Sequence, residues 1–150
     1  MPAASPASGT YGCILHATTV SRSNRALVIM GPSGSGKSAL ALQLMAMGAG
    51  IIADDRTIVT PTPDGPPLAH CPPELSGRIE ARGVGLLQAA TAPAAPVVGI
   101  VDLSQTETER LPPLRSYELL GCQIPCFHKV ATAHFAPALL LYLDGGRSPV

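Results

Sequence analysis

Short apolar segments separated by turn residues make up the first third of the chain. Residues 11–20 alternate and become β-branched toward their end, a pattern that predicts a strand. Residues 26–30, ALVIM, form a continuous apolar run of the kind found in buried strands. The intervening Arg22-Ser23-Asn24 is expected to form a turn. The two strands should therefore pair as a hairpin.

A helix and another strand are predicted next. Residues 38–47 consist largely of strong helix formers, with Leu40, Leu44 and Met47 along one stripe. Gly48 follows directly and suits the position just beyond a helix end. The segment GIIADD, 50–55, begins with a second apolar run and predicts a buried strand that ends on two aspartates. We expect RTIVT, which follows, to continue this strand.

The rest of the chain predicts further strands, exposed loops and a terminal helix. Strands are expected at PLAHC (67–71), at RIEARGVGLL (78–87) with a tight bend at its glycines, at VVGIVDL (97–103), and as one strand at SYELLGCQIP (116–125). The charged, turn-rich segment 104–115 is expected to be exposed, and residues 129–143 are helical by composition, with a kink or restart at Pro137. This pattern predicts an α/β fold with a strand-rich mixed sheet rather than a regular alternation.

Composition adds limits to this picture. A length of 150 residues is typical of one domain, and we expect a flexible tail at 1–10 followed by a single domain at 11–150. The formal net charge is zero and no basic block occurs, which argues against a nucleic-acid partner. No apolar run is long enough to span a bilayer and the N-terminus lacks the pattern of a secretory signal. A cytoplasmic protein without a membrane partner is therefore expected.

The positions of the cysteines favour a role in packing over a metal site or disulfides. The four are scattered, which favours reduced thiols in a protein without an export signal. Cys122 and Cys126, with His128 and His134 downstream, raise the possibility of a metal site, but their spacing is not a standard zinc pattern. We therefore favour the interpretation that they are small packed residues.

The segment between the apolar run ALVIM and the predicted helix carries a nucleotide-binding motif. GPSGSGKS matches G-x-x-x-x-G-K-[ST], in which glycines let backbone N–H groups curl around a phosphate. The following helix points its positive end at the same anion. Lys37 would reach the outer phosphates of ATP and the Ser38 hydroxyl suits Mg²⁺. The residues expected to bind the nucleotide are Gly31, Pro32, Ser33, Gly34, Ser35, Gly36, Lys37 and Ser38.

Phosphoryl transfer also needs a group that orients or deprotonates the acceptor, and carboxylates occur in three places. Asp54 and Asp55 end one predicted strand, Glu80 lies between apolar neighbours, and Asp102 ends another apolar run. From the spacing alone, a solvated strand end explains the two adjacent aspartates as well as a catalytic role does. Asp102 and Glu80 both remain candidates for the acid that supports a metal.

The segment from the P-loop to TIV resembles the core of the HPr kinase/phosphorylase family. In that family the P-loop helix leads to a strand that ends in an ADDR-type motif, here at residues 53–56. A second signature follows, here IEARGVG at 79–85. A third element is a histidine on the strand before the P-loop, here His16. The chain resembles the short form of alphaproteobacteria, which consists of the C-terminal kinase domain alone, and its C-terminal helices look shortened.

The resemblance implies roles for individual residues. Lys37 would bind the β- and γ-phosphates of ATP, and Ser38 and Glu80 would hold Mg²⁺. Asp54 or Asp55 would take the proton of the acceptor serine, with His16 beside that carboxylate. Arg82 would organise the site, and Arg110 is the match for an arginine that acts in the reverse reaction.

The family relationship also implies a P-loop kinase domain of the HPr kinase/phosphorylase type, with a P-loop helix and a C-terminal helix. The expected activity is ATP-dependent phosphorylation of a serine on the phosphocarrier protein HPr, together with its dephosphorylation, by a homo-oligomer. Two alternatives from the residues remain: a small-molecule P-loop kinase, and a non-catalytic nucleotide-binding regulator. The first normally needs an arginine-rich lid, and no such segment occurs.

Overall fold

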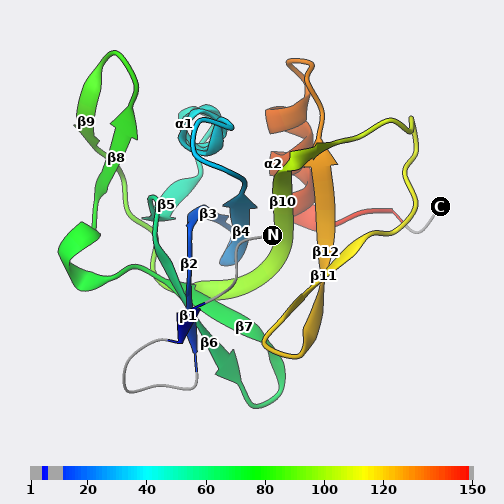
Figure 1. Ribbon diagram of the computed structural model, residues 1–150, viewed down its shortest axis with the longest axis horizontal. Coiled ribbons are helices and arrows are strands. Elements are labelled where there is room, and N and C mark those ends of the chain that lie inside the picture. Colours follow the sequence, from blue (N-terminus) through cyan, green and yellow to red (C-terminus); the bar gives the residue numbers. More distant parts are fainter. Residues whose placement is uncertain (1–4, 7–11, 149–150) are drawn as a thin grey trace.

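The computed structural model describes residues 5–6 and 12–148. Within these residues the chain forms a strand-rich curled sheet and two α-helices that pack on one of its faces (Figure 1). Strand β1 (Ser5–Pro6) pairs antiparallel with β2 (Cys13–Leu15). The other residues of the predicted tail, 1–4 and 7–10, lie outside the described part. No helix of the described residues is long and apolar enough to cross a bilayer.

One long strand, β10 (Ala95–Thr106), connects the two halves of the sheet. Its first residues pair antiparallel with β7, whereas residues 97–102 run parallel to β4 on one side and residues from Ile100 onward run parallel to β12 on the other. Figure 1 shows the resulting curve of this strand. The other strands of the two halves are β6 (Thr57–Thr62), β7 (Gly65–His70), β5 (Gly50–Ala53), β3 (Ala17–Arg22), β4 (Arg25–Met30), β11 (Ser116–Leu119) and β12 (Cys122–Lys129).

The predicted hairpin before the P-loop is confirmed as β3–β4, with Ala17 opposite Met30. Its turn residues Ser23 and Asn24 both have positive φ, as a two-residue hairpin turn of type I′ requires. The prediction of one strand over 11–20 is wrong, because the chain breaks at His16. The part before the break, β2, pairs with β6, and β3 pairs with β4 and β5; Tyr11 lies outside the described residues.

The apolar run ALVIM is buried on both faces of the sheet. Leu27 and Ile29 belong to the hydrophobic cluster that includes both helices. Ala26, Val28 and Met30 belong to the cluster on the opposite face. Because alternate side chains of a strand point to opposite faces, a strand covered on both sides must be apolar at every position. This double burial fixes the strand that leads into the P-loop.

The first helix, α1 (Lys37–Ala46), agrees with its prediction and ends before Gly48, whose φ is +111°. The second, α2 (Phe135–Gly145), starts later than predicted, because Lys129 still belongs to β12. Pro137 neither kinks nor restarts this helix. It lies in the first turn, where a proline removes no intrahelical hydrogen bond.

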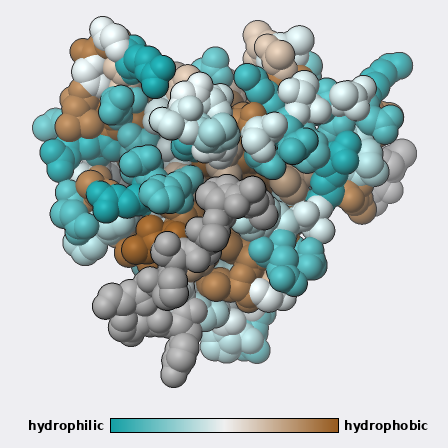
Figure 2. All heavy atoms as spheres, viewed as in Figure 1, coloured by the Kyte–Doolittle hydropathy of each residue, from teal (hydrophilic) through white to brown (hydrophobic). Residues whose placement is uncertain are grey.

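The signature IEARGVG lies on a separate hairpin, β8 (Arg78–Ala81) and β9 (Gly85–Gln88), which follows the short 3₁₀ helix η1 (Pro73–Leu75). The tight bend predicted there is confirmed. Ile79 is 1% exposed and anchors the hairpin on the hydrophobic cluster that includes both helices. Val84 and Leu86 are exposed, and apolar atoms are visible at this end of the molecule in the upper left of Figure 2.

Two strand predictions in the remaining chain are wrong. SYELLGCQIP does not form one strand, because Leu120 and Gly121 turn the chain between β11 and β12. Both turn residues have positive φ, +49° and +81°. RTIVT does not continue β5 either: the chain turns at Asp55, and β6 joins the other half of the sheet.

Candidate active site

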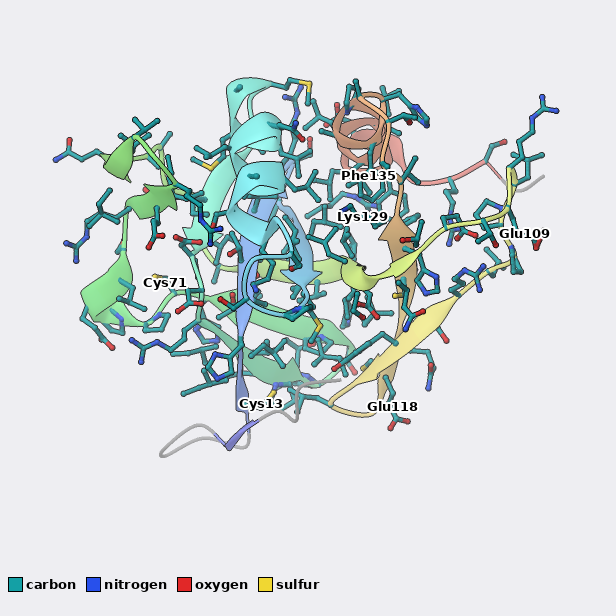
Figure 3. The ribbon with its side chains drawn as sticks, turned by 45° about the horizontal axis from the view of Figure 1, so that its top comes forward. Cys13, Cys71, Glu109, Glu118, Lys129 and Phe135 are labelled. Atoms are coloured by element: carbon teal, nitrogen blue, oxygen red, sulfur yellow. The ribbon has the colours of Figure 1, made fainter. Side chains whose placement is uncertain are left out.

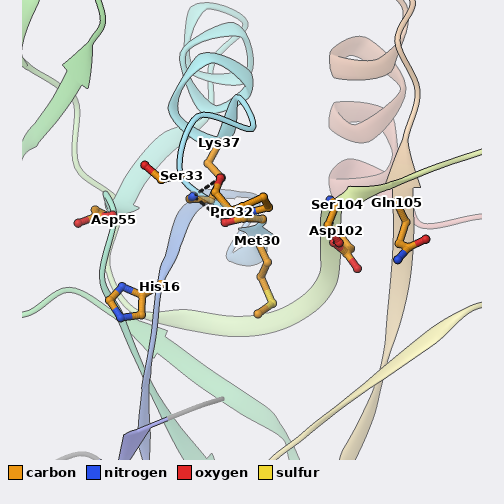
Figure 4. A pocket seen from close by; sticks show the side chains of 10 residues that line it. His16, Met30, Pro32, Ser33, Lys37, Asp55, Asp102, Ser104 and Gln105 are labelled. Carbon is orange, nitrogen blue, oxygen red and sulfur yellow. Dashed lines mark hydrogen bonds between the residues drawn. The ribbon is translucent and has the colours of Figure 1, made fainter. Parts of the chain in front are cut away.

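A pocket of about 670 Å³ lies where β4 ends and the P-loop begins. Figure 4 shows His16 and Asp55 on one side of it, Lys37 and Ser33 at the P-loop, and Asp102 with its neighbours on the opposite side. The residues that line it are His16, Met30, Gly31, Pro32, Ser33, Lys37, Asp55, Asp102, Ser104 and Gln105. The P-loop, one of the two adjacent aspartates and the predicted histidine therefore share one cavity.

The P-loop has the backbone that an anion cradle requires. Gly34 and Gly36 have φ values of +82° and +100°, a region that residues with a Cβ rarely adopt. Helix α1 begins directly after Gly36, without a side-chain cap and without an acidic residue in its first turn. Its first N–H groups and the positive end of its dipole are thus left for a negative ligand. These features fit a polyphosphate chain.

Lys37 lies over the loop and lines the pocket. Its Nζ donates hydrogen bonds to the carbonyl oxygens of Gly31, at 2.7 Å, and Pro32, at 3.2 Å (Figure 4). The side chain is half-buried, so its charge is held at the mouth of the glycine loop. A flexible ammonium group in this place can move onto a phosphate oxygen with little change elsewhere.

Asp54 joins three parts of the site. Its Oδ1 accepts hydrogen bonds from Ser38 Oγ at 2.8 Å and from Thr18 Oγ1 at 2.9 Å. Its Oδ2 accepts one from the backbone N–H of Glu80 at 3.0 Å. A carboxylate with three such donors is fixed in orientation. The P-loop helix, strand β3 and the β8–β9 hairpin therefore meet at this side chain.

Asp55 has a different environment from its neighbour. The N–H of Arg56 donates to the carbonyl oxygen of Asp54 at 2.8 Å, and Asp55 between them has a φ of +69°. This is a γ-turn, which is rare and strained for a residue other than glycine. The Asp55 side chain is exposed, lines the pocket, and its carboxylate has no hydrogen-bond partner among the described residues. His16, at the break between β2 and β3, lies on the same side of the pocket (Figure 4).

The structure brings Glu80 close to the site but not into the pocket. Its backbone contacts Asp54, whereas its side chain is exposed and does not line the cavity. Oxygen donors from Ser38, Asp54 and Glu80 are of the kind that Mg²⁺ prefers. No group of three or more metal-ligating side chains is found in the part of the chain that the structure describes.

Arg110 is not brought to the pocket. It is exposed in the loop between β10 and β11, and Figure 3 shows its neighbour Glu109 far out on this loop. The fixed arginine of this region is Arg115. Its Nε and Nη2 each donate to the carboxylate of Glu107 at 3.0 Å. The hydrogen bonds from Arg115 lower the pKa of Glu107 to about 2.

The opposite side of the pocket carries residues that the sequence only partly indicated. Asp102, the rival acid, lies on β10 opposite Met30 of β4 and accepts a hydrogen bond of 2.9 Å from the Ser104 N–H. Ser104 and Gln105 line the same side and were not predicted. Thr18 was also missed, although its hydroxyl contacts Asp54. Its position depends on the pairing of β3 with β5, which no local pattern reveals.

The cysteines agree with the packing interpretation. All four are free, and Cys13 and Cys126 are buried. Burial raises the pKa of the Cys126 thiol to about 11. Cys13 and Cys126 belong to a hydrophobic core cluster and Cys71 and Cys122 pack against it, as the packing interpretation predicts.

Comparison with known proteins relates this site to a described family. Residues 10–98 match the model of the HPr serine kinase C-terminal domain. This range includes His16, the P-loop, both aspartates and Glu80, but not Asp102 or Arg110. The match therefore contains the residues that meet around Asp54.

Proteins with similar sequences are HPr kinase/phosphorylases, in agreement with the family model. An HPr kinase/phosphorylase of Bordetella petrii is 45% identical over 65 residues, which are 43% of this chain and 21% of that protein. An HPr kinase/phosphorylase of Cupriavidus necator is 37% identical over 111 residues, 65% of this chain and 34% of that protein. The chain thus aligns with only a fifth to a third of the length of these relatives.

A solved structure has the same fold. The Hpr(Ser) kinase/phosphatase from Coxiella burnetii matches with a TM-score of 0.70 over 87% of each chain, at 20% sequence identity. The strand-rich α/β arrangement predicted from the sequence is thereby confirmed at the level of the fold. With the match of the family model to more than half of the residues, the chain belongs to the HPr serine kinase C-terminal domain family.

Proposed function

We propose that this chain is a kinase that transfers the γ-phosphoryl group of ATP to a serine of an HPr-like phosphocarrier protein. The observation that carries the proposal is the difference in surroundings between two adjacent aspartates. Asp54 is held by Ser38 of the P-loop, and Asp55 is free in the same pocket as Lys37. A bound triphosphate and a proton acceptor are then neighbours.

Asp55 is the candidate for the base in this proposal. A base needs an unengaged oxygen that can face the acceptor hydroxyl, and all three donors around the pair point to Asp54. Asp55 takes the serine proton while the serine oxygen forms a bond to the γ-phosphorus and the bond to the β–γ bridging oxygen breaks. ADP leaves with that oxygen. His16, on the same side of the pocket, orients Asp55 or the acceptor.

Lys37 and the P-loop bind the transferred group. The backbone N–H groups of the loop and the first turn of α1 face the β- and γ-phosphates, and Lys37 releases its carbonyl partners to contact them. Because the Ser38 proton is donated to Asp54, the lone pairs of its oxygen are left for a cation. A magnesium ion held there by Ser38, with Asp54 and Glu80 nearby, would neutralise charge on the phosphate oxygens.

The remaining parts of the proposal follow from the family. The relatives are named for two activities, so we propose that the same pocket also removes the phosphoryl group from seryl-phosphorylated HPr. Arg110 would act in that direction only if its loop moved. We further propose that the protein works in the cytoplasm and as a homo-oligomer.

The test is transfer of label from γ-labelled ATP to purified HPr by the purified chain. Lys37→Ala should abolish transfer, and the matched control is Lys129→Ala. Lys129 is the other lysine of the chain and does not line the pocket. Its variant should retain the wild-type rate.

The outcomes separate the alternatives. Label on a serine of HPr, lost in Lys37→Ala alone, supports the proposal. Nucleotide binding without transfer to HPr or to any small molecule would favour a regulator. Transfer to a small hydroxyl compound but not to HPr would favour a small-molecule kinase.

A further inference from the structure

Thr18 connects the two aspartates of the site. It lies on β3, is fully buried, and donates from Oγ1 to Asp54 Oδ1 at 2.9 Å. The same oxygen accepts a hydrogen bond of 3.3 Å from the backbone N–H of Asp55. A hydroxyl has one proton and two lone pairs, so both bonds can exist together. One side chain thus holds the carboxylate of one aspartate and the backbone of the next.

These contacts surround a strained segment. Asp55 adopts a φ of +69° inside the γ-turn that the Arg56 N–H closes onto the Asp54 carbonyl. Such conformations persist only when the surrounding structure holds them. Among the side chains described, Thr18 is the one with hydrogen bonds to both aspartates.

The turn has a consequence for the direction of the two carboxylates. Neighbouring residues in a regular strand point to opposite faces, and β5 ends just before the pair. With the γ-turn in place, Asp54 meets Ser38 and Glu80, and Asp55 lines the pocket. A relaxed backbone at Asp55 would change the direction of its carboxylate.

We propose that Thr18 is a positioning residue: its hydroxyl fixes the γ-turn, so that Asp54 engages the P-loop while Asp55 faces the phosphoryl acceptor. The effect on catalysis rests on the proposed function, but the effect on the turn does not. Thr18 touches neither nucleotide nor acceptor in this account, because it does not line the pocket.

The test uses three variants. Thr18→Val removes the hydroxyl at nearly constant volume, and Thr18→Ser keeps it. Thr19→Val is the matched control, because Thr19 is the next residue of β3 and is equally buried. Its hydroxyl donates to Thr57 Oγ1 at 2.8 Å, since the Thr57 proton is already donated to the Ala17 carbonyl. Thr19→Val therefore deletes a buried hydrogen bond with no contact to either aspartate.

The first readout needs no activity. Amide hydrogen exchange at Asp55 should become about tenfold faster in Thr18→Val, because the acceptor of this N–H is gone. Thr18→Ser and Thr19→Val should leave the exchange rate at Asp55 near that of the wild type. If Thr18→Val does not fold, Thr18→Ala takes its place in the same comparison.

The second readout is transfer to HPr. Thr18→Val should lower kcat by at least about tenfold with little change in KM for ATP. Thr18→Ser, which keeps the hydroxyl, should have a kcat near that of the wild type. Wild-type exchange at Asp55 in Thr18→Val would overturn the inference, and so would faster exchange with an unchanged kcat. An equal loss of kcat in Thr19→Val would also overturn it, because the cause would then be general destabilisation. If the wild type transfers no phosphate, the proposed function fails, and exchange at Asp55 alone decides the role of Thr18.

Discussion

Ser38 Oγ donates a hydrogen bond of 2.8 Å to Asp54 Oδ1, which connects the first turn of the P-loop helix to the residue that follows strand β5. The hydroxyl proton is thereby directed away from the glycine loop. The oxygen lone pairs of Ser38 are left for a cation at the phosphates. Under the proposed function, Asp54 would act on the nucleotide through Ser38, and Asp55 would be left for the acceptor.

Asp54→Asn should weaken both the fold and the dependence of nucleotide binding on Mg²⁺. An amide cannot accept from Ser38, Thr18 and the Glu80 N–H together, because one of its two polar atoms is a donor. Loss of one hydrogen bond to the charged carboxylate should cost about 1–3 kcal/mol of the free energy of unfolding, measured by urea denaturation.

The control for this variant is Asp64→Asn, which changes an exposed aspartate in the turn between β6 and β7. Its free energy of unfolding should stay within about 0.5 kcal/mol of the wild type. If Asp54→Asn is as stable as this control and keeps the full effect of Mg²⁺ on nucleotide affinity, Asp54 does not connect the parts of the site.

Ser35→Ala should stabilise the protein. The Ser35 hydroxyl oxygen is buried in the P-loop and has no hydrogen-bond partner in the described residues. Removal of an unsatisfied buried hydroxyl relieves its desolvation cost, so we expect a gain of about 1 kcal/mol, or about 3 °C in Tm. Ser33→Ala, at an exposed position of the same loop, should leave Tm unchanged. A lower Tm for Ser35→Ala would mean that this hydroxyl has a partner.

Glu107→Gln should remove a contribution to stability that the wild type has at neutral pH and loses at low pH. The Arg115 hydrogen bonds lower the pKa of Glu107 from 4.5 to about 2 in the folded protein. A group with a lowered folded pKa contributes stability above its unfolded pKa, and loses it as the pH falls from about 4.5 to about 2. The Tm difference between wild type and Glu107→Gln should therefore be largest near pH 6 and vanish near pH 2.

The control for this pH series is Glu118→Gln, at an exposed position of β11. Its Tm should follow that of the wild type across the whole range. A Tm difference for Glu107→Gln that is the same at pH 6 and pH 2 would show that the Glu107–Arg115 pair adds no pH-dependent stability.

The parts of the fold that could be predicted are those whose cause is local. ALVIM is apolar at every position because β4 is buried on both faces, and the glycines of the P-loop are needed for its positive φ values. The turn at Leu120 and Gly121 was missed because leucine rarely has a φ of +49°. Asn-Gly at this place would have indicated a hairpin.

The site was predictable where residues are close in sequence and not where the sheet brings them together. Ser104 and Gln105 reach the pocket because β10 runs parallel to β4, about seventy residues away in the chain. Thr18 reaches Asp54 because β3 pairs with β5. Asp54 and Asp55 have different surroundings because of the γ-turn, and no residue preference predicts that turn.

The most direct test of the central claim is the single-turnover rate of phosphoserine formation on HPr by wild type and Asp55→Asn at saturating ATP. Asparagine has nearly the same shape as aspartate, and both are found at positive φ more often than other non-glycine residues, so the γ-turn should remain. We expect a rate at least about 100-fold below that of the wild type, with nucleotide affinity unchanged. A rate within a few-fold of the wild type would contradict the assignment of Asp55 as the base, and with it the proposed division of labour between the two aspartates.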